Sequence, residues 1–570
     1  MTRRRLPLIF ALSMATLLVP ACRGGDADRP ADERIEEVPV AERYGGTATV
    51  ALILDLQSMN SLTSTETYSR LVQRDVLFMP LFRYDESLTP VPWLAERWDT
   101  TRVSPDTLEL TVHLRSDVRW HDGEPTTADD VLFTYQRARD PAVGSSLASS
   151  FALYSPAATR LDLHTVSFRL RPHSDFLDGW TQMAIMPRHV LGDVPPEQLA
   201  QHAFGSASPV GNGPFRFVRR VPGSEWVFEA NPEFPEGLGG RPFLDRLVFR
   251  AVPEQTTLLT ELVSGGVDVY LRVRADQIAQ LEGSPSVRLA SSPGQEWVFI
   301  AWNGRDPKFD TPEERRALTQ GIDRPGIVAG LAAGQGRAGR STVTPGHWAF
   351  DSTSAQVALS HDATRAANLL SQAGWVDRTG DGIREDEAGR PFRFTLLIPQ
   401  GNDTGRDIAQ VVQAQLRNIG VDVRLSVLEG NTLVSRIMGS EDGRGGRQRE
   451  FEAVVMGWND NLRKDDSNLF HSRNINNPFQ ITGYANPRVD ALLDTLPLIM
   501  DREQARPLWL EYQTLLAQDA PKTVLFYPDR VTGIRQRLRG VEVDRRGELV
   551  SVARWWLQPD QRRGSPTAVN

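Results

Sequence analysis

Residues 118–131 (VRWHDGEPTTADDV) are the stretch that decides the fold, because they combine a polar turn with the start of a helix. Gly123 and Pro125 are typical of a turn. Thr127 then predicts the N-cap of a helix whose first turn carries acidic side chains, which stabilise the positive end of the helix dipole. Residues 108–114 (LELTVHL), just before the turn, alternate apolar and polar side chains and predict a strand.

The second half of the chain alternates helix and strand patterns. Residues 408–419 carry apolar side chains on one helical face, and Gly420 predicts the end of that helix. Residues 421–428 (VDVRLSVL) then alternate as a strand. A helix, a glycine and a strand in this order are a building block of an α/β fold. Residues 315–330 are also amphipathic, and Pro325 interrupts the predicted helix.

Several short motifs carry a resemblance to a known family. They are 92–98 (PWLAERW), 110–131 with its HDGEP turn, 211–215 (GNGPF), 264–268 (SGGVD), 321–324 (GIDR) and 456–458 (MGW). Together, and in this order, they resemble the bacterial extracellular solute-binding proteins of family 5, the peptide and nickel receptors of ABC importers. The resemblance covers about residues 45–558.

The resemblance implies an α/β fold of two lobes, the type II arrangement of periplasmic binding proteins, with an extra β-rich domain inserted in lobe one. Mapped onto this chain, lobe one takes residues 44–75, 205–290 and 525–558, the inserted domain 76–204, lobe two 291–524 and a C-terminal tail 559–570. Such a receptor closes on its ligand by a hinge motion and passes it to permease subunits with their ATPases. It needs no catalytic step and no cofactor, and we expect a monomer.

The N-terminus has the layout of a secretory signal. Three arginines precede an apolar run over 6–19, which is too short to cross a bilayer. Residues 19–22 (VPAC) resemble a bacterial lipobox, so we expect cleavage after residue 21 and a lipid on Cys22. The alternative is a plain signal peptide with an incidental cysteine. Residues 22–43 are charged and poor in large apolar side chains, which predicts a flexible tether from a membrane on the extracytoplasmic side of the cell envelope.

Composition excludes several classes of function. The net charge is −8, with 72 acidic and 64 basic residues, which disfavours binding to nucleic acid. Only three basic residues are lysines, and none follows a phosphate-binding glycine loop. A single cysteine excludes internal disulfides, and the nine histidines include no zinc-hydrolase motif. Residues 377–382 begin like a calcium loop, but Ala388 stands where the last ligand belongs, so we interpret them as a turn and expect no metal.

The candidate ligand site follows from the resemblance. Trp458, Asn459 and Asp460 match the place where peptide receptors of the family present an aromatic wall and an aspartate, which would pair with a peptide α-ammonium. The following residues depart from the family pattern and add Lys464, so the amine partner could be Asp460, Asp465 or Asp466, and a solvated loop is the alternative. Trp302 and Asn303 are expected on the other wall, with a core tryptophan as the alternative for Trp302; the remaining candidates are Tyr68 and Asn212.

Three rival functions remain open at this point. The same fold could bind a nickel chelate, an opine or an oligosaccharide, and a sugar site would use aromatic stacking without a buried carboxylate. A secreted hydrolase would need paired carboxylates or a nucleophile in the cleft. A signalling lipoprotein would keep the cleft empty. The sequence therefore predicts a peptide receptor and leaves the identity of the ligand undetermined.

Overall fold

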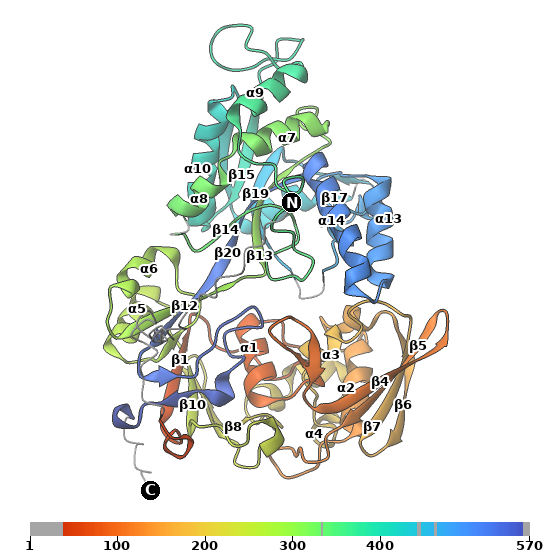
Figure 1. Cartoon of the computed structure of the whole chain (residues 1–570), viewed down its shortest axis with the longest axis vertical. Helices are drawn as coiled ribbons and strands as arrows, with labels where there is room; N and C mark the ends of the chain where they lie inside the picture. The colour runs from red at the N-terminus through yellow and green to blue at the C-terminus, as the bar shows by residue number, and fades with distance from the viewer. Residues whose placement is uncertain (1–37, 332–333, 442–445, 461–463, 563–570) are drawn as a thin grey trace, which may run out of the picture.

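A computed structural model of the chain describes residues 38–331, 334–441, 446–460 and 464–562 (Figure 1). Cys22, the predicted signal peptide, most of the tether and part of the C-terminal tail lie outside these residues. Two α/β bodies stand one above the other, and we call the lower one lobe I and the upper one lobe II. Within the described part of the chain, no helix is both long and apolar enough to cross a membrane.

A mixed sheet of 12 strands runs through both lobes, with β12 and β14 pairing with β20 beside the main path. Its order is β16 (Asp422–Leu428), β15 (Arg393–Pro399), β19 (Ala453–Asn459), β13 (Glu296–Trp302), β20 (Lys522–Arg535), β11 (Val269–Tyr270), β1 (Thr47–Leu52), β10 (Arg246–Ala251), β9 (Glu225–Ala230) and β8 (Phe215–Val221). The bounds of the two side strands are β12 (Val287–Pro293) and β14 (Gly336–Ala338). The order places β20 in the middle of the sheet, between strands of lobe II and lobe I.

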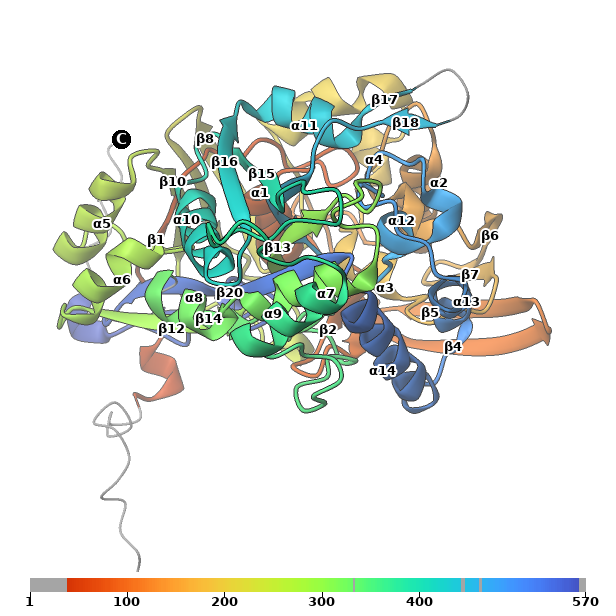
Figure 2. The ribbon, with the colours of Figure 1, turned by 90° about the horizontal axis from the view of Figure 1, so that it is seen from above.

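The strand β20 itself passes from one lobe to the other (Figure 1), and β12 runs alongside it (Figure 2). Its residues up to Pro528 pair with β13 and β14, and its residues from Asp529 onward pair with β12 and β11. The chain also crosses between the lobes at Gly294 and Gln295, which join β12 to β13. Two adjacent connections therefore link the lobes, which is the arrangement a hinge requires.

Lobe I packs three further helices and one short hairpin around its half of the sheet. Its core contains Val50 of β1 together with Ile534 and Trp555 from the far end of the chain. The helices are α1 (Thr67–Val72), followed by a π-helical turn over Gln73–Leu77, α5 (Gln255–Ser264) and α6 (Ala275–Glu282). The hairpin of lobe I consists of β21 (Leu538–Arg539) and β22 (Trp556–Leu557), and a second hairpin, β2 (Phe82–Tyr84) and β3 (Pro90–Pro92), lies at the start of the inserted domain.

An inserted domain carries its own antiparallel sheet in the order β4 (Ala95–Ser104), β5 (Thr107–Leu114), β7 (Thr165–Leu170) and β6 (Tyr154–Asp162). The alternation in β5 matches its burial, because every second side chain enters the core. The predicted cap is confirmed: Thr127 and Asp130 form a capping box at the start of α2 (Ala128–Arg139). The short helices are α3 (Asp178–Gln182) and α4 (Arg188–Leu191).

The signature turn joins the inserted domain to lobe I. The backbone N–H of His121 donates to Gly211 O at 2.7 Å, and its Nε2 lies 3.0 Å from Gly213 O. Burial lowers the pKa of His121 to about 4, so the ring is neutral at pH 7. A Cβ on Gly211 would lie 2.0 Å from Leu77 O, so only glycine fits there. His121 is therefore a packed, hydrogen-bonded histidine.

Lobe II covers its sheet with helices on both faces. The predicted helix–glycine–strand unit is confirmed as α10 (Asp403–Arg417), Gly420 with φ of 87° and β16. The pattern over 315–330 forms two helices rather than one, α7 (Pro312–Gly321) and α8 (Arg324–Leu331), because the break comes before Pro325. The others are α9 (Ala363–Gln372), α11 (Gly430–Met438), α12 (Ser467–Phe470), α13 (Pro487–Thr495) and α14 (Arg502–Asp519), with the small strands β17 (Ser440–Glu441) and β18 (Arg447–Gln448).

Candidate functional site

Charged side chains from both lobes meet where β12, β13 and β20 cross. Arg272 Nε of lobe I lies 3.4 Å from Glu548 Oε1, and its guanidinium lies 5.3 Å from the ring centroid of Tyr68. Burial raises the pKa of Glu296, at the start of β13, while Arg272 and Arg530 oppose the shift. Arg272 of lobe I and Glu296 of lobe II therefore interact electrostatically across the lobe boundary. The predicted site residue Tyr68 therefore lies at this boundary, and burial raises the pKa of its hydroxyl.

The end of β19 points toward the same boundary. Register pairs Trp458 with Trp297 and Asn459 with Glu296, so both predicted residues lie at the lobe I end of lobe II. Trp458 is half-buried against Phe479, with ring centroids 5.9 Å apart, and Asn459 is exposed. The strand thus presents an aromatic side chain and an amide beside the crossing segments.

Directly after β19, two of the predicted aspartates share one lysine. Lys464 Nζ lies 2.7 Å from Asp460 Oδ2 and 2.8 Å from Asp466 Oδ1, and it donates to Thr342 O at 2.7 Å. The second carboxylate oxygen of Asp466 accepts hydrogen bonds from Tyr512 Oη at 2.6 Å and Thr342 Oγ1 at 2.8 Å. Asp465, by contrast, is exposed and accepts the backbone N–H of Ser467. The structure brings Asp460 and Asp466 together and leaves Asp465 outside.

Burial and charge compete within this cluster of Asp460, Lys464 and Asp466, which we call the lysine–aspartate cluster. Burial raises the pKa of Asp460 to about 6, although Lys464 opposes the shift. Burial disfavours the ammonium of Lys464, but the two aspartates outweigh it and raise the pKa of that lysine. The lysine is therefore charged at neutral pH, and its charge holds the carboxylates in the buried site.

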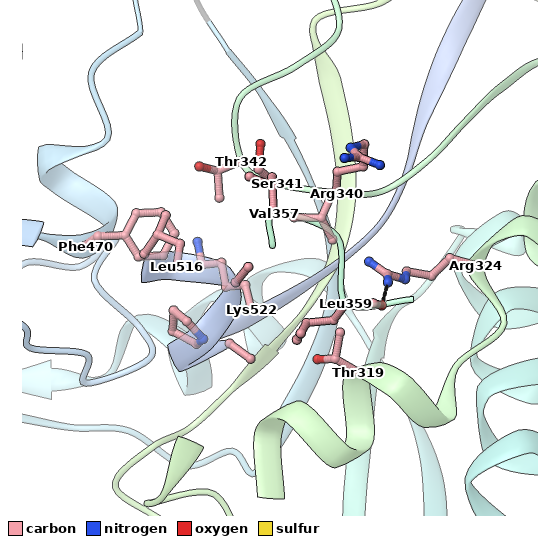
Figure 3. Close-up of a pocket in the computed structure, with 14 residues that line it drawn as sticks. Thr319, Arg324, Arg340, Ser341, Thr342, Val357, Leu359, Phe470, Leu516 and Lys522 are labelled. Carbon is pink, nitrogen blue, oxygen red and sulfur yellow. Dashed lines mark hydrogen bonds between the residues drawn. The ribbon is translucent and has the colours of Figure 1, made fainter. Parts of the chain in front are cut away.

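A second lysine, Lys522, borders the cluster and a small cavity inside lobe II (Figure 3). Its Nζ lies 4.5 Å from the ring centroid of Phe299 and 5.1 Å from that of Phe470. Burial lowers the pKa of Lys522 to about 7, although Asp466 opposes the shift. The cavity holds about 20 Å³, room for one water-sized molecule, and the dashed line in Figure 3 marks Arg324 bonded to Leu359 O. This cavity is too small for a peptide.

Trp302 and Asn303 lie elsewhere. The strands β13 and β19 are antiparallel, so Trp302 pairs with Ala453 at the end of β13 remote from Trp458. Trp302 is 0% exposed, packs against Phe309 and Phe394, and donates to Thr523 Oγ1 at 3.0 Å. Asn303 donates to Phe451 O at 2.8 Å. The structure does not bring these two residues together with Trp458, because the register separates them.

Asn212 is part of the joint between lobe I and the inserted domain. It is 1% exposed, its Oδ1 accepts the backbone N–H of Met79 at 2.9 Å, and its Nδ2 lies 3.4 Å from Thr126 Oγ1. Both ends of the amide are therefore engaged within the protein. Its position beside the signature turn explains why a small polar residue stands between two glycines.

On the inserted-domain side, lobe II contacts the lower body directly. The backbone N–H of Ser174 donates to Pro497 O at 2.6 Å, and Arg502 Nη2 donates to Leu88 O at 2.9 Å. Leu88 and Asp175, which follows Ser174, both have φ of 57°, a conformation that non-glycine residues rarely adopt. Such backbone strain persists where surrounding contacts hold it, and both strained residues lie at contacts between the two bodies.

A wider hollow of about 640 Å³ lies in the lower body rather than between the lobes. Its lining residues belong to lobe I and the inserted domain, except Arg43, which directly precedes lobe I. The guanidinium of Arg83 stacks 4.0 Å from the ring centroid of Trp93, and burial together with Arg546 and Arg554 lowers the pKa of Arg83. Its lining includes Arg74, Arg83, Tyr84, Trp93, Arg546 and Arg554.

The turn that begins like a calcium loop gathers Asp377, Asp381 and Glu385 within 4.8 Å of one another. Each carboxylate accepts hydrogen bonds from its own turn: Asp377 from two glycine N–H groups, Asp381 from Ile383, and Glu385 from Arg378 and Thr379. These bonds account for the acidic side chains as turn-forming groups.

Sequence reasoning assigned no role to the residues that complete the site, and Lys464 stood out only as a departure from the family pattern. Lys464 and Lys522 are two of only three lysines in the chain, a signal that was visible in the composition. Tyr512 and Thr342 come from distant segments and carried no local signal. Arg272 has φ of 59°, which no sequence pattern predicts for an arginine.

Comparisons with known proteins agree with this architecture. A sequence model of the bacterial extracellular solute-binding proteins, family 5 Middle, matches residues 89–478. The oligopeptide-binding protein AppA of Bacillus subtilis is 28% identical over 98% of this chain and 100% of its own length. Its structure in complex with a nonapeptide has a TM-score of 0.71, covering 90% of this chain and 99% of that one. NikZ from Campylobacter jejuni, solved with Ni(L-His), has a TM-score of 0.71 at 21% identity, covering 90% and 99% of the two chains.

Proposed function

The chain belongs to family 5 of the bacterial extracellular solute-binding proteins, and from this premise we propose that it is the peptide-binding receptor of an ABC importer. The observation that carries the proposal is the full-length likeness to an oligopeptide-binding protein, which was solved with a nonapeptide bound. The receptor would hand its peptide to permease subunits with their ATPases. A non-enzymatic role fits, because the relatives are solute-binding proteins.

Binding would work through closure of the two lobes. The paired connections at Gly294 and β20 permit a hinge, and a ligand that contacts both lobes favours the closed form by its differential affinity. We propose that the ligand lies beside the lobe boundary, where Tyr68, Trp458 and Asn459 meet the crossing segments. We propose the lobes at the bounds given from the sequence with two small shifts: β20 crosses between Pro528 and Asp529 rather than before residue 525, and the other connection crosses at Gly294 and Gln295 rather than after residue 290.

The location of the receptor follows from its N-terminus. We propose that residues 1–21 are removed as a signal peptide and that Cys22 carries a lipid anchor, with residues up to 43 as a tether. The mature protein would then act as a monomer on the extracytoplasmic face of a membrane. Metabolic labelling with a palmitate analogue, compared between the natural chain and Cys22→Ser, tests the anchor; equal labelling would refute it.

Thermal unfolding of the protein from residue 23 onward tests the ligand class. Pools of peptides from dipeptides to nonapeptides are compared with nickel–histidine, opine and oligosaccharide pools. A ligand at 100 times its dissociation constant adds about 2.7 kcal/mol to the folded state, which raises the midpoint visibly. A shift with peptides alone supports the proposal. A shift with another pool alone keeps the fold and overturns the peptide.

A further inference from the structure

We propose that Lys464 is a built-in amine, which occupies the acceptor site of Asp460 and Asp466, so that the receptor accepts peptides whose N-terminus is blocked as readily as free ones. The inference rests on the proposed peptide function and narrows it. The ligand class is a peptide recognised through its backbone and side chains rather than through its α-ammonium at these aspartates.

The geometry of Lys464 leaves no donor unused. A lysine ammonium has three N–H groups, and three acceptors surround this one: Asp460 Oδ2, Asp466 Oδ1 and Thr342 O, at 2.7, 2.8 and 2.7 Å. A peptide α-ammonium also has three N–H groups and would seek the same acceptors. The site is therefore already filled by the chemical group that an amine-reading site would bind.

The aspartates are also closed off from solvent. The side chains of Lys464 and Asp466 are 2% and 1% exposed, and that of Asp460 is 7% exposed. Tyr512 and Thr342 occupy the second carboxylate oxygen of Asp466. An incoming ammonium would have to displace Lys464, because the oxygens of Asp460 and Asp466 that face the lysine are already occupied and Tyr512 and Thr342 fill the other oxygen of Asp466.

The charge balance leads to the same conclusion. Two carboxylates face Lys464 from their own loop, while Lys522 and His347 face the cluster from β20 and from the segment after Thr342. Burial lowers the pKa of His347 to about 3, so that ring stays neutral, and Lys522 with a pKa of about 7 is partly charged. Little net negative charge remains at neutral pH to attract another cation.

Lysine is rare in this chain, and two of its three lysines lie together in the fold. The chain has 64 basic residues and only three are lysines, yet Lys464 belongs to this cluster and Lys522 borders it. Arginine, which supplies all the basic residues of the chain except its three lysines, ends in a planar guanidinium. Lysine alone among side chains ends in a primary ammonium, the same group as a peptide N-terminus, so its use at this position matches the acceptor geometry.

A chemical rescue tests the occupied site without any peptide. Lys464→Ala in the chain from residue 23 onward removes the amine and leaves the acceptors. Propylammonium, which replaces the missing atoms, should raise the unfolding midpoint of this variant, whereas tetramethylammonium, which has no N–H, should not. The natural chain and the control Lys308→Ala should respond to neither. A variant as stable as the natural chain and indifferent to propylammonium would overturn the inference.

Lysine reactivity provides a readout that needs no variant, should Lys464→Ala fail to fold. Reductive methylation of the natural protein with formaldehyde, followed by peptide mass mapping, should modify Lys308 at least tenfold faster than Lys464. Equal rates would show that the ammonium of Lys464 is accessible and would refute the occupied site.

Matched peptide pools then test the ligand class. Nonapeptide pools with free and N-acetylated ends should bind the natural protein within about threefold of one another. A preference above tenfold for free ends overturns the inference and leaves the peptide function intact. A lack of binding by both pools overturns the peptide function itself, and the inference about its ligand with it.

Discussion

Gly294 and Pro528 meet where the two connections between the lobes run side by side: a Cβ on Gly294 would lie 2.6 Å from Pro528 O. The two crossing segments are thus packed so closely that no side chain fits between them. Hinge motion must occur as a joint movement of both segments, because neither can move past the other.

Gly294→Ala should destabilise the protein by about 1–3 kcal/mol, because its methyl group forces the two crossing segments apart. Urea unfolding measures the loss. Gly330→Ala is the matched control: a Cβ there meets nothing within 4 Å and the residue lies in α8, so a gain of about 0.5–1 kcal/mol is expected. Equal effects of the two variants would contradict the close approach.

Tyr512→Phe should cost about 1.5–3 kcal/mol, because Tyr512 Oη donates to the buried carboxylate of Asp466 and the phenyl ring cannot. Unfolding by urea at pH 7 checks the value. The control Tyr44→Phe changes a side chain that is 39% exposed and should stay within about 0.5 kcal/mol of the natural protein. If Tyr512→Phe left the free energy of unfolding unchanged, this hydrogen bond would not be needed to stabilise the buried carboxylate of Asp466.

Lys522→Met should change how stability depends on pH. Burial lowers the folded-state pKa of Lys522 to about 7, whereas an unfolded lysine titrates near about 10.4. Between these values the unfolded chain binds more protons, so the natural protein gains up to about 1.4 kcal/mol per pH unit relative to Lys522→Met as pH rises. Unfolding free energies at pH 7, 8 and 9 measure the difference.

Lys308→Met is the control for that experiment. Burial opposes the charge of Lys308, but hydrogen bonds to Glu452 and Asp306 outweigh it and raise the pKa of this lysine. The stabilisation that charged Lys308 provides is present throughout pH 7–9 and is lost only at higher pH. The difference in unfolding free energy between the natural protein and Lys308→Met should therefore stay constant over this range. A flat curve for Lys522→Met as well would show that the ammonium of Lys522 is not held in a desolvated site.

Arg502→Ala should loosen the docking of lobe II on the inserted domain. The side chain donates to Leu88 O across the boundary, and the loss of one such bond, about 1 kcal/mol, shifts the ratio of open to closed molecules roughly fivefold. Small-angle X-ray scattering should show a larger radius of gyration. Arg506→Ala is the matched control. The guanidinium groups of Arg502 and Arg506 both lie over the Trp348 ring, but Arg506 donates to Trp348 O within lobe II, so its loss should leave the radius of gyration unchanged.

Local sequence patterns predicted local structure well. The cap at Thr127, the alternation in β5 and the unit of α10, Gly420 and β16 each depend on neighbours a few residues away, and each is present. Family motifs predicted the two-lobed α/β fold. Pro325 predicted an interruption of the helix over 315–330. In the structure the interruption lies a few residues earlier, between Gly321 and Arg324, and separates two helices.

The details of the site depend on distant residues and were not predictable in the same way. The pairing of β13 with β19 separates Trp302 from Trp458, and no local pattern specifies the register of two strands so far apart in the chain. The partner of Asp460 and Asp466 was anticipated as a ligand amine, whereas Lys464 of the chain itself lies there. Only tertiary packing decides which cation reaches a buried carboxylate.

The central place of β20 has a consequence for biosynthesis. The core around β1, one of the earliest strands to be made, is completed by Ile534, Leu549 and Trp555. The core of lobe II likewise includes Leu525 and Phe526 of β20, which are synthesised late. Neither lobe can therefore finish folding until nearly the whole chain has been synthesised. A prematurely terminated chain lacks the strand that both cores share, so it exposes apolar surface and becomes a substrate for proteases instead of a defective receptor.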